Sequence, residues 1–127
     1  MQHERDRPIL DATARDRVLG VLELLADRDA QMAYQRAVPI AMVSAELLCF
    51  WDEVFWSESS ELRSLFTEPE WQALLRFHSI FERVMRLMPH TPLPPIEEFV
   101  KSPHWYQLSS AAKRARIGLH AAAGGAA

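Results

Sequence analysis

Glycine is scarce in this sequence and is missing from most of its length. The four glycines are Gly20, Gly118, Gly124 and Gly125, so residues 21–117 contain none. Walker phosphate loops, dinucleotide-binding G-x-G-x-x-G turns and G-x-S-x-G nucleophile elbows all need glycine where the backbone turns sharply or approaches a phosphate. The same stretch lacks the Asn-Gly and Asp-Gly turns that β-hairpins favour. The sequence therefore favours an all-α fold without these glycine-dependent sites.

Cysteine occurs once, as Cys49. A single cysteine excludes an internal disulfide framework and a zinc site made only of cysteines, and it suits a reducing compartment. The first seven residues alternate in charge and lead into no apolar signal-peptide core. We therefore expect the protein to reside in the cytoplasm.

Long apolar runs and an excess of one charge are also missing. Uncharged internal runs, such as residues 37–45, fall far short of the roughly 20 residues that a membrane-spanning helix needs. The net charge is −3, with arginines and acids intermixed, so no overall field attracts DNA or anionic lipid. We expect neither nucleic acid nor membrane among the partners.

The residues that are present predict one helical domain. The chain has 127 residues, of which 49% are hydrophobic and 24% charged, as in an ordinary globular domain. We predict a single domain over residues 1–120 and a flexible Ala/Gly tail over residues 121–127. The predicted fold is an all-α, compact helical bundle of about four main helices with short accessory helical turns.

The four main helices are predicted from apolar periodicity and from their start signals. They cover residues 11–28, 39–56, 67–88 and 102–120, with short helical stretches at 29–37, 57–66 and 96–101 and a proline-rich linker at 89–95. Thr67-Glu68-Pro69-Glu70 is the clearest start signal, because Thr67 and Glu70 have the spacing of a capping box around an early proline. Ser102-Pro103 repeats this cap-plus-proline pattern.

The central predicted helix, 39–56, is apolar on more than one side. At 100° per residue its main apolar face holds Ile40, Val43, Leu47, Phe50, Trp51 and Val54. Leu48 and Phe55 fall on the far side of this helix, where a small bundle has little to cover them. This pattern predicts self-association through the central helix.

Four ionisable residues form a candidate ligand-binding cluster. Glu46 and Glu53 are seven residues apart on the central helix, while His78 and Glu82 are one turn apart on the next long helix. Such a set could bind a metal or perform acid–base chemistry. However, the sequence has no Glu-x-x-His motif of the kind found in carboxylate-bridged metal bundles. The sequence favours a buried histidine paired with a neighbouring carboxylate, and we predict no metal and no cofactor.

Aromatic residues are concentrated in one part of the chain. Eight of the twelve lie between positions 50 and 81: Phe50, Trp51, Phe55, Trp56, Phe66, Trp71, Phe77 and Phe81. Three interpretations are open, namely a packed core, a pocket for a flat ligand, and an interface with another chain. In the second interpretation Trp51 and Trp71 would line the pocket beside the Glu/His cluster.

The sequence thus favours a non-catalytic helical interaction or regulatory module. Its expected partner is a second copy of the chain, as a homodimer, or another protein. The alternative is a small-ligand- or metal-binding bundle protein, or an enzyme, that uses Glu46, Glu53, His78 and Glu82 in an aromatic-lined cavity.

Overall fold

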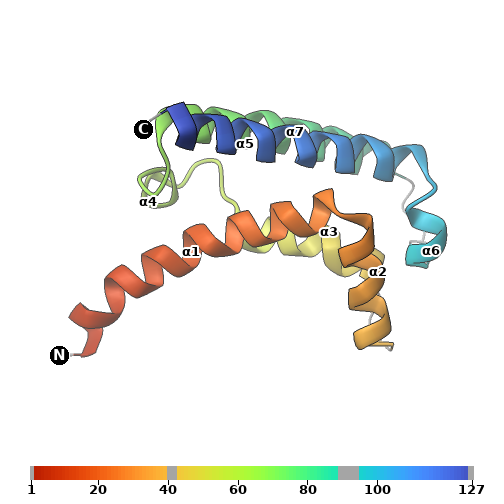
Figure 1. Ribbon diagram of the computed structural model, residues 1–127, viewed down its shortest axis with the longest axis horizontal. Helices are drawn as coiled ribbons and strands as arrows, with labels where there is room; N and C mark the ends of the chain where they lie inside the picture. Colours follow the sequence, from red (N-terminus) through yellow and green to blue (C-terminus); the bar gives the residue numbers. More distant parts are fainter. Residues whose placement is uncertain (1, 40–42, 89–94, 126–127) are drawn as a thin grey trace.

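Helices make up almost all of the regular structure of this chain. A computed structural model describes residues 2–39, 43–88 and 95–125. Across these ranges it contains helices and no strands, which confirms the all-α prediction (Figure 1). The helices are α1 (Gln2–Ala26), α2 (Arg28–Ala37), α3 (Val43–Val54), α4 (Ser60–Arg63), α5 (Glu68–Leu87), α6 (Ile96–Phe99) and α7 (Pro103–Gly125).

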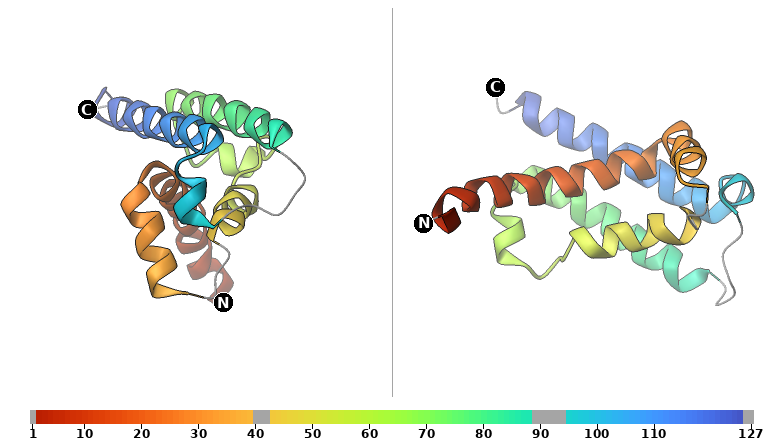
Figure 2. Two further views of the ribbon diagram at one scale, coloured as in Figure 1. Left: turned by 90° about the vertical axis from the view of Figure 1, so that its right-hand side faces the viewer. Right: turned by 90° about the horizontal axis from the view of Figure 1, so that it is seen from below.

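The longer helices form two layers. Helices α1 and α3 lie side by side in one layer, and α5 and α7 lie side by side in the other (Figures 1 and 2). Helix α7 runs antiparallel to both α1 and α5, so α1 begins and α7 ends at the same end of the molecule. The short helix α4 lies toward that end, whereas α2 and α6 lie together at the opposite end.

Aromatic rings join α3 to α5. Trp51 of α3 meets Phe77 of α5 edge-to-face at 4.6 Å between ring centroids, and Phe55 lies 5.2 Å from Trp71. These four side chains are each at most 2% exposed. Each buried aromatic removes on the order of 150–250 Å² from water. The aromatic stripe of the sequence is therefore mainly the core of the bundle.

Small residues let α5 and α7 approach closely. Ala73 of α5 is buried, as are Ala111 and Ala115 of α7. A Cβ atom added to Gly118 would lie 3.3 Å from the Cβ of Ala73. The absence of a side chain at position 118 thus sets how near the two helices come.

Polar side chains cap the helices where the sequence predicted them to do so. Thr67 Oγ1 accepts a hydrogen bond from the backbone N–H of Glu70 at 3.3 Å, and Glu70 Oε1 accepts one from the N–H of Thr67 at 2.8 Å. This geometry confirms the capping box at the start of α5. Ser102 Oγ likewise accepts from the N–H of Trp105 at 3.2 Å, which confirms the predicted cap before Pro103.

The corner between α1 and α2 is closed by α7. Gln31 is fully buried, and its Nε2 donates to the carbonyls of Leu24 and Leu25 at 3.0 and 3.2 Å. Its Oε1 accepts a hydrogen bond from Trp105 Nε1 at 2.7 Å. Ser109 Oγ donates to the carbonyl of Ala26 at 3.5 Å. Side chains therefore satisfy carbonyls that the end of α1 leaves without partners in the helix.

Several predicted helix ends differ from the structure. Helix α1 begins at Gln2 rather than at residue 11, and α7 continues to Gly125, past the predicted end at 120. Periodicity shows where a buried stripe lies, but a helix can continue beyond the residues that it buries. The predicted start of the central helix, including Ile40, and most of the proline-rich linker lie outside the described residues.

The expectation that Leu48 and Phe55 are left uncovered is wrong. Leu48 is 3% exposed and Phe55 is 2% exposed within a single chain. Helix α3 packs against α1 on one side while its aromatic side chains reach α5, so more than one of its sides is buried. The apolar far side of this helix thus serves the core, and self-association through it loses its basis.

Candidate functional site

Two of the four predicted cluster residues meet at the junction of α3 and α5. His78 Nδ1 accepts a hydrogen bond from Trp51 Nε1 at 3.1 Å, and His78 Nε2 lies 2.9 Å from Glu82 Oε1. The side chain of His78 is 17% exposed, whereas that of Glu82 is 56% exposed. His78 is therefore a mostly buried histidine with a partner on each ring nitrogen, the arrangement that the sequence favoured.

The other two cluster residues are used elsewhere. Glu46 Oε1 accepts a hydrogen bond from the hydroxyl of Tyr34 on α2 at 2.9 Å, and this bond raises the pKa of the Tyr34 hydroxyl above 10.0. Glu53 is exposed. Among the residues that the structure describes, no three His, Cys, Asp or Glu side chains are grouped so that they could hold a metal ion.

Trp51 and Trp71 are packed against other rings. Trp51 stacks on Phe55 at 4.7 Å, and Trp71 lies 6.1 Å from Phe66. Both tryptophans are at most 2% exposed. Their surroundings are those of core residues, and of the two tryptophans Trp51 is the one that donates a hydrogen bond to His78.

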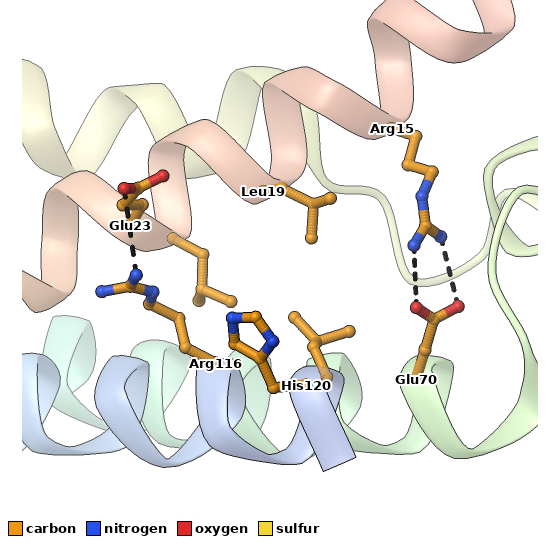
Figure 3. A pocket seen from close by; sticks show the side chains of 8 residues that line it. Arg15, Leu19, Glu23, Glu70, Arg116 and His120 are labelled. Atoms are coloured by element: carbon orange, nitrogen blue, oxygen red, sulfur yellow. Dashed lines mark hydrogen bonds and ion pairs between the residues drawn. The ribbon is translucent and has the colours of Figure 1, made fainter. Parts of the chain in front are cut away.

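A pocket that the sequence did not indicate lies where α1 and α7 pass each other near the start of α5 (Figure 3). Its volume is about 230 Å³. The residues that line it are Arg15, Leu19, Leu22, Glu23, Glu70, Arg116, Leu119 and His120. Leu19 lies between its two ends, and an ion pair stands at each end. Its two sides come from segments about a hundred residues apart in the chain, so no local motif indicates it.

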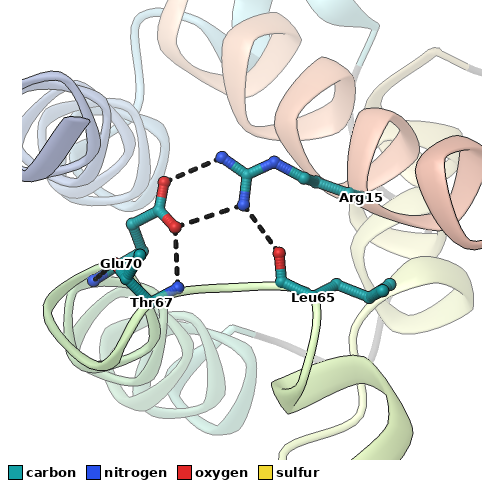
Figure 4. Close-up of polar contacts among 4 residues, drawn as sticks. All are labelled: Arg15, Leu65, Thr67 and Glu70. Atoms are coloured by element: carbon teal, nitrogen blue, oxygen red, sulfur yellow. Dashed lines mark hydrogen bonds and ion pairs between the residues drawn. The ribbon is translucent and has the colours of Figure 1, made fainter. Parts of the chain in front are cut away.

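A tight ion pair closes one end of this pocket. The Arg15 guanidinium donates to both carboxylate oxygens of Glu70, at 2.8 and 3.2 Å, and to the carbonyl of Leu65 at 2.9 Å (Figure 4). Its Cζ also lies 4.8 Å from the centre of the Phe66 ring. The hydrogen bond from Arg15 holds the pKa of Glu70 below 4.5, against the opposing effect of burial. At neutral pH the charges of Arg15 and Glu70 are therefore paired with each other.

A loose ion pair stands at the other end. Arg116 Nη2 lies 3.8 Å from Glu23 Oε1, beyond hydrogen-bonding distance, and the two side chains are 40% and 65% exposed. His120 is also exposed, and its ring projects toward the pocket between Arg116 and Glu70 (Figure 3). This end of the pocket is accessible to water, and its opposite charges are only loosely paired.

A second, more open hollow of about 530 Å³ lies beside the α1–α2 corner. It is lined by Ala26, Asp27, Arg28, Asp29, Lys113, Arg116 and Ile117. Acidic and basic side chains thus share one surface, with the acids on the corner and Lys113 on α7.

Helix α7 carries a stripe of three exposed residues and one half-buried residue next to this hollow. We call Tyr106, Ser110, Lys113 and Ile117 the outer stripe of α7. Their spacing of four, three and four residues places them on one side of the helix. Tyr106 and Ile117 are each 69% exposed. The views of Figure 2 show α7 at the edge of the molecule, covered by α1 and α5 on only part of its circumference.

Comparisons with known proteins add no family or fold assignment. No protein-family model, curated protein or solved structure matches the chain. Within residues 2–39, 43–88 and 95–125, no helix has both the length and the apolar character needed to cross a membrane.

Proposed function

We propose that the protein is a non-catalytic interaction module that pairs with a second copy of itself through the outer stripe of α7. The observation that carries this proposal is the exposure of Tyr106 and Ile117, 69% each, on one side of one helix. These two large side chains lie about three helical turns apart. Their burial against another surface is favourable in free energy, because it removes apolar area from water.

The spacing of the outer stripe favours a second copy as the partner. The stripe is symmetric about a point between residues 111 and 112. If two α7 helices pack antiparallel, Tyr106 of each copy lies opposite Ile117 of the other, and Ser110 lies opposite Lys113. A two-fold symmetric interface requires this kind of self-complementary surface.

Charges beside the stripe support the same partner. Asp29 and Lys113 line the same open hollow, which adjoins the C-terminal half of the stripe. Because Lys113 lies close to the symmetry point, a two-fold axis there carries the lysine of one copy toward the acidic corner of the other. Complementary charges across an interface fix its register and oppose wrong partners.

The cytoplasm, which the single cysteine favoured, is the compartment that we propose.

Sedimentation equilibrium tests the apolar part of the proposal. The parent chain should show a mass above its monomer value of 14.6 kDa at concentrations on the order of 100 µM, since an interface of one helix pair is small. The double variant Tyr106→Ser, Ile117→Ser should be monomeric. Trp56→Ser is the matched control, because Trp56 is 57% exposed outside the stripe. A monomeric parent, or equal loss of association in the control, would contradict the proposal.

A charge exchange tests the two-fold arrangement. Lys113→Glu alone and Asp29→Lys alone should each weaken self-association, because each places like charges together across the interface. An equimolar mixture of the two variants should associate, since both pairs across the axis are then opposite in charge. Pairing within one chain cannot produce this recovery on mixing. A mixture that stays as weak as its components would overturn the antiparallel arrangement.

A further inference from the structure

The pocket between α1 and α7 has the size of a small organic ligand. Its volume of about 230 Å³ equals that of roughly eight waters at ~30 Å³ each. It is smaller than the roughly 300 Å³ at which pockets for drug-sized ligands begin. A nucleotide or a large cofactor is therefore excluded, whereas a molecule of about seven non-hydrogen atoms has a suitable size.

The middle of the pocket is apolar. Leu19 projects from α1 into the space between the two helices (Figure 3). Leu22 and Leu119 also line the pocket, although they are 0% and 7% exposed overall. A short aliphatic group placed here would leave water and contact leucine side chains on two helices.

The accessible end of the pocket offers a cation whose acidic partner lies beyond hydrogen-bonding distance. Arg15 is fully engaged by Glu70 and Leu65. Arg116, in contrast, has Glu23 at 3.8 Å, and exposed ion pairs of this kind contribute little. A guanidinium matches a carboxylate in shape and binds it through two parallel hydrogen bonds. A ligand carboxylate can thus take the place of Glu23, with the His120 ring alongside.

From these features we infer that the pocket binds a small monocarboxylate with a short branched aliphatic chain. The aliphatic chain lies among Leu19, Leu22 and Leu119, and the carboxylate accepts hydrogen bonds from Arg116. Affinity is on the order of millimolar, because the ion pair stays partly in water and the apolar area is small. This site lies on the side of α7 that faces α1 rather than on the outer stripe, although Arg116 also lines the open hollow beside the stripe.

Titrations of isovalerate and isovaleramide, followed by amide NMR shifts at pH 7, test the inference. The two probes have nearly the same shape and differ in charge. Isovalerate should produce saturable shifts at Leu19, Leu22 and Leu119. The affinity for isovaleramide should be about fivefold lower than that for isovalerate, or lower still. Acetate, which has no branched chain, should also bind more weakly than isovalerate.

Two variants with opposite expected effects make the test specific. Arg116→Gln should weaken isovalerate binding about fivefold, whereas Glu23→Gln should strengthen it by removing the competing carboxylate. Arg114→Gln is the matched control, because Arg114 is an exposed cation of α7 that does not line the pocket. Its affinity for isovalerate should equal that of the parent.

Several results would overturn the inference. No saturable shift at the three leucines would show that the pocket does not bind this class of ligand. Equal affinity for the acid and the amide would show an apolar crevice without carboxylate recognition, as would equal losses in Arg114→Gln and Arg116→Gln. The titrations should give the same result in the Tyr106→Ser, Ile117→Ser variant, which separates this site from self-association.

Discussion

The indole nitrogen of Trp51 on α3 donates a hydrogen bond to Nδ1 of His78 on α5 at 3.1 Å. Because Nδ1 is the acceptor, the hydrogen of the neutral imidazole must be on Nε2, which faces Glu82 at 2.9 Å. His78 thus accepts a hydrogen bond from a fully buried tryptophan through one ring nitrogen and contacts an exposed carboxylate through the other. The pair fixes how α3 lies against α5.

Replacement of His78 should show its structural role. His78→Ala leaves the indole N–H of Trp51 without its acceptor, so the free energy of unfolding should fall by about 1–3 kcal/mol. Glu82→Ala removes only the exposed partner and should cost about 0.5 kcal/mol or less. Urea unfolding measures both. A large rise in the unfolding temperature of the parent with zinc or manganese, lost in His78→Ala, would instead favour a metal site.

The Arg15–Glu70 pair should make the protein sensitive to acid. The pKa of Glu70 in the folded protein is below its ordinary value of 4.5, chiefly because of the hydrogen bond from Arg15. Its contribution to stability is therefore complete above pH 4.5 and is lost as the pH falls from there through the lower folded-state pKa. Arg15→Gln should lower the unfolding free energy by about 2 kcal/mol at pH 7.

A pH series of urea unfolding curves separates this effect from general acid denaturation. Between pH 7 and 3 the parent should lose more stability than Arg15→Gln, because the variant has already lost the interaction that lowers the Glu70 pKa. Arg63→Gln is a suitable control, since Arg63 pairs with Glu68 on the surface, with side chains 56% and 60% exposed. Parallel curves for the parent and Arg15→Gln would contradict this interpretation of Glu70.

The two helical glycines that the structure describes fully should respond differently to substitution. Gly20 is exposed on α1 with no atom within 4 Å of an added Cβ, so Gly20→Ala should stabilise the protein by about 0.5–1 kcal/mol. At Gly118 the added Cβ would lie 3.3 Å from the Cβ of Ala73. Gly118→Leu should therefore separate α5 from α7 and cost about 1–3 kcal/mol.

Thermal unfolding of these variants checks the close approach of the helices. Gly118→Ala should be less stable than Gly20→Ala, because crowding offsets the gain in helix propensity. Ala73→Gly combined with Gly118→Leu should recover part of the loss, since it removes the Cβ that is in the way. Equal stabilisation by alanine at positions 20 and 118 would show that the two helices are not in tight contact there.

Features with local causes could be predicted from the sequence. The capping box of Thr67 and Glu70 lies within four residues, and the structure has both of its hydrogen bonds. The all-α fold follows from the absence of glycine turns and from the apolar periodicity. The partnership of His78 with Glu82 spans one helical turn and was predicted for the same reason.

Features that depend on distant segments could not be predicted. Glu70 was recognised as a capping residue, but its partner Arg15 is 55 residues away. The sequence grouped Glu46 with His78, yet the hydroxyl that Glu46 binds comes from Tyr34 on α2. The burial of Leu48 and Phe55 could not be predicted, because a helical wheel shows the sides of a helix and not the number of neighbours that cover them. The α1–α7 pocket likewise depends on segments far apart in the chain, so no local pattern predicts it.

The closed corner between α1 and α2 has a consequence for the order of folding during synthesis. The chain leaves the ribosome from its N-terminus, so residues 24–31 are made long before Trp105 and Ser109. Until those two residues are synthesised, the side-chain oxygen of Gln31 and the carbonyl of Ala26 lack the hydrogen-bond donors that they have in the folded protein. Water must donate hydrogen bonds to them instead. In a nascent chain that ends before α7, the corner between α1 and α2 is therefore hydrated. Water leaves it only when α7 packs against the corner.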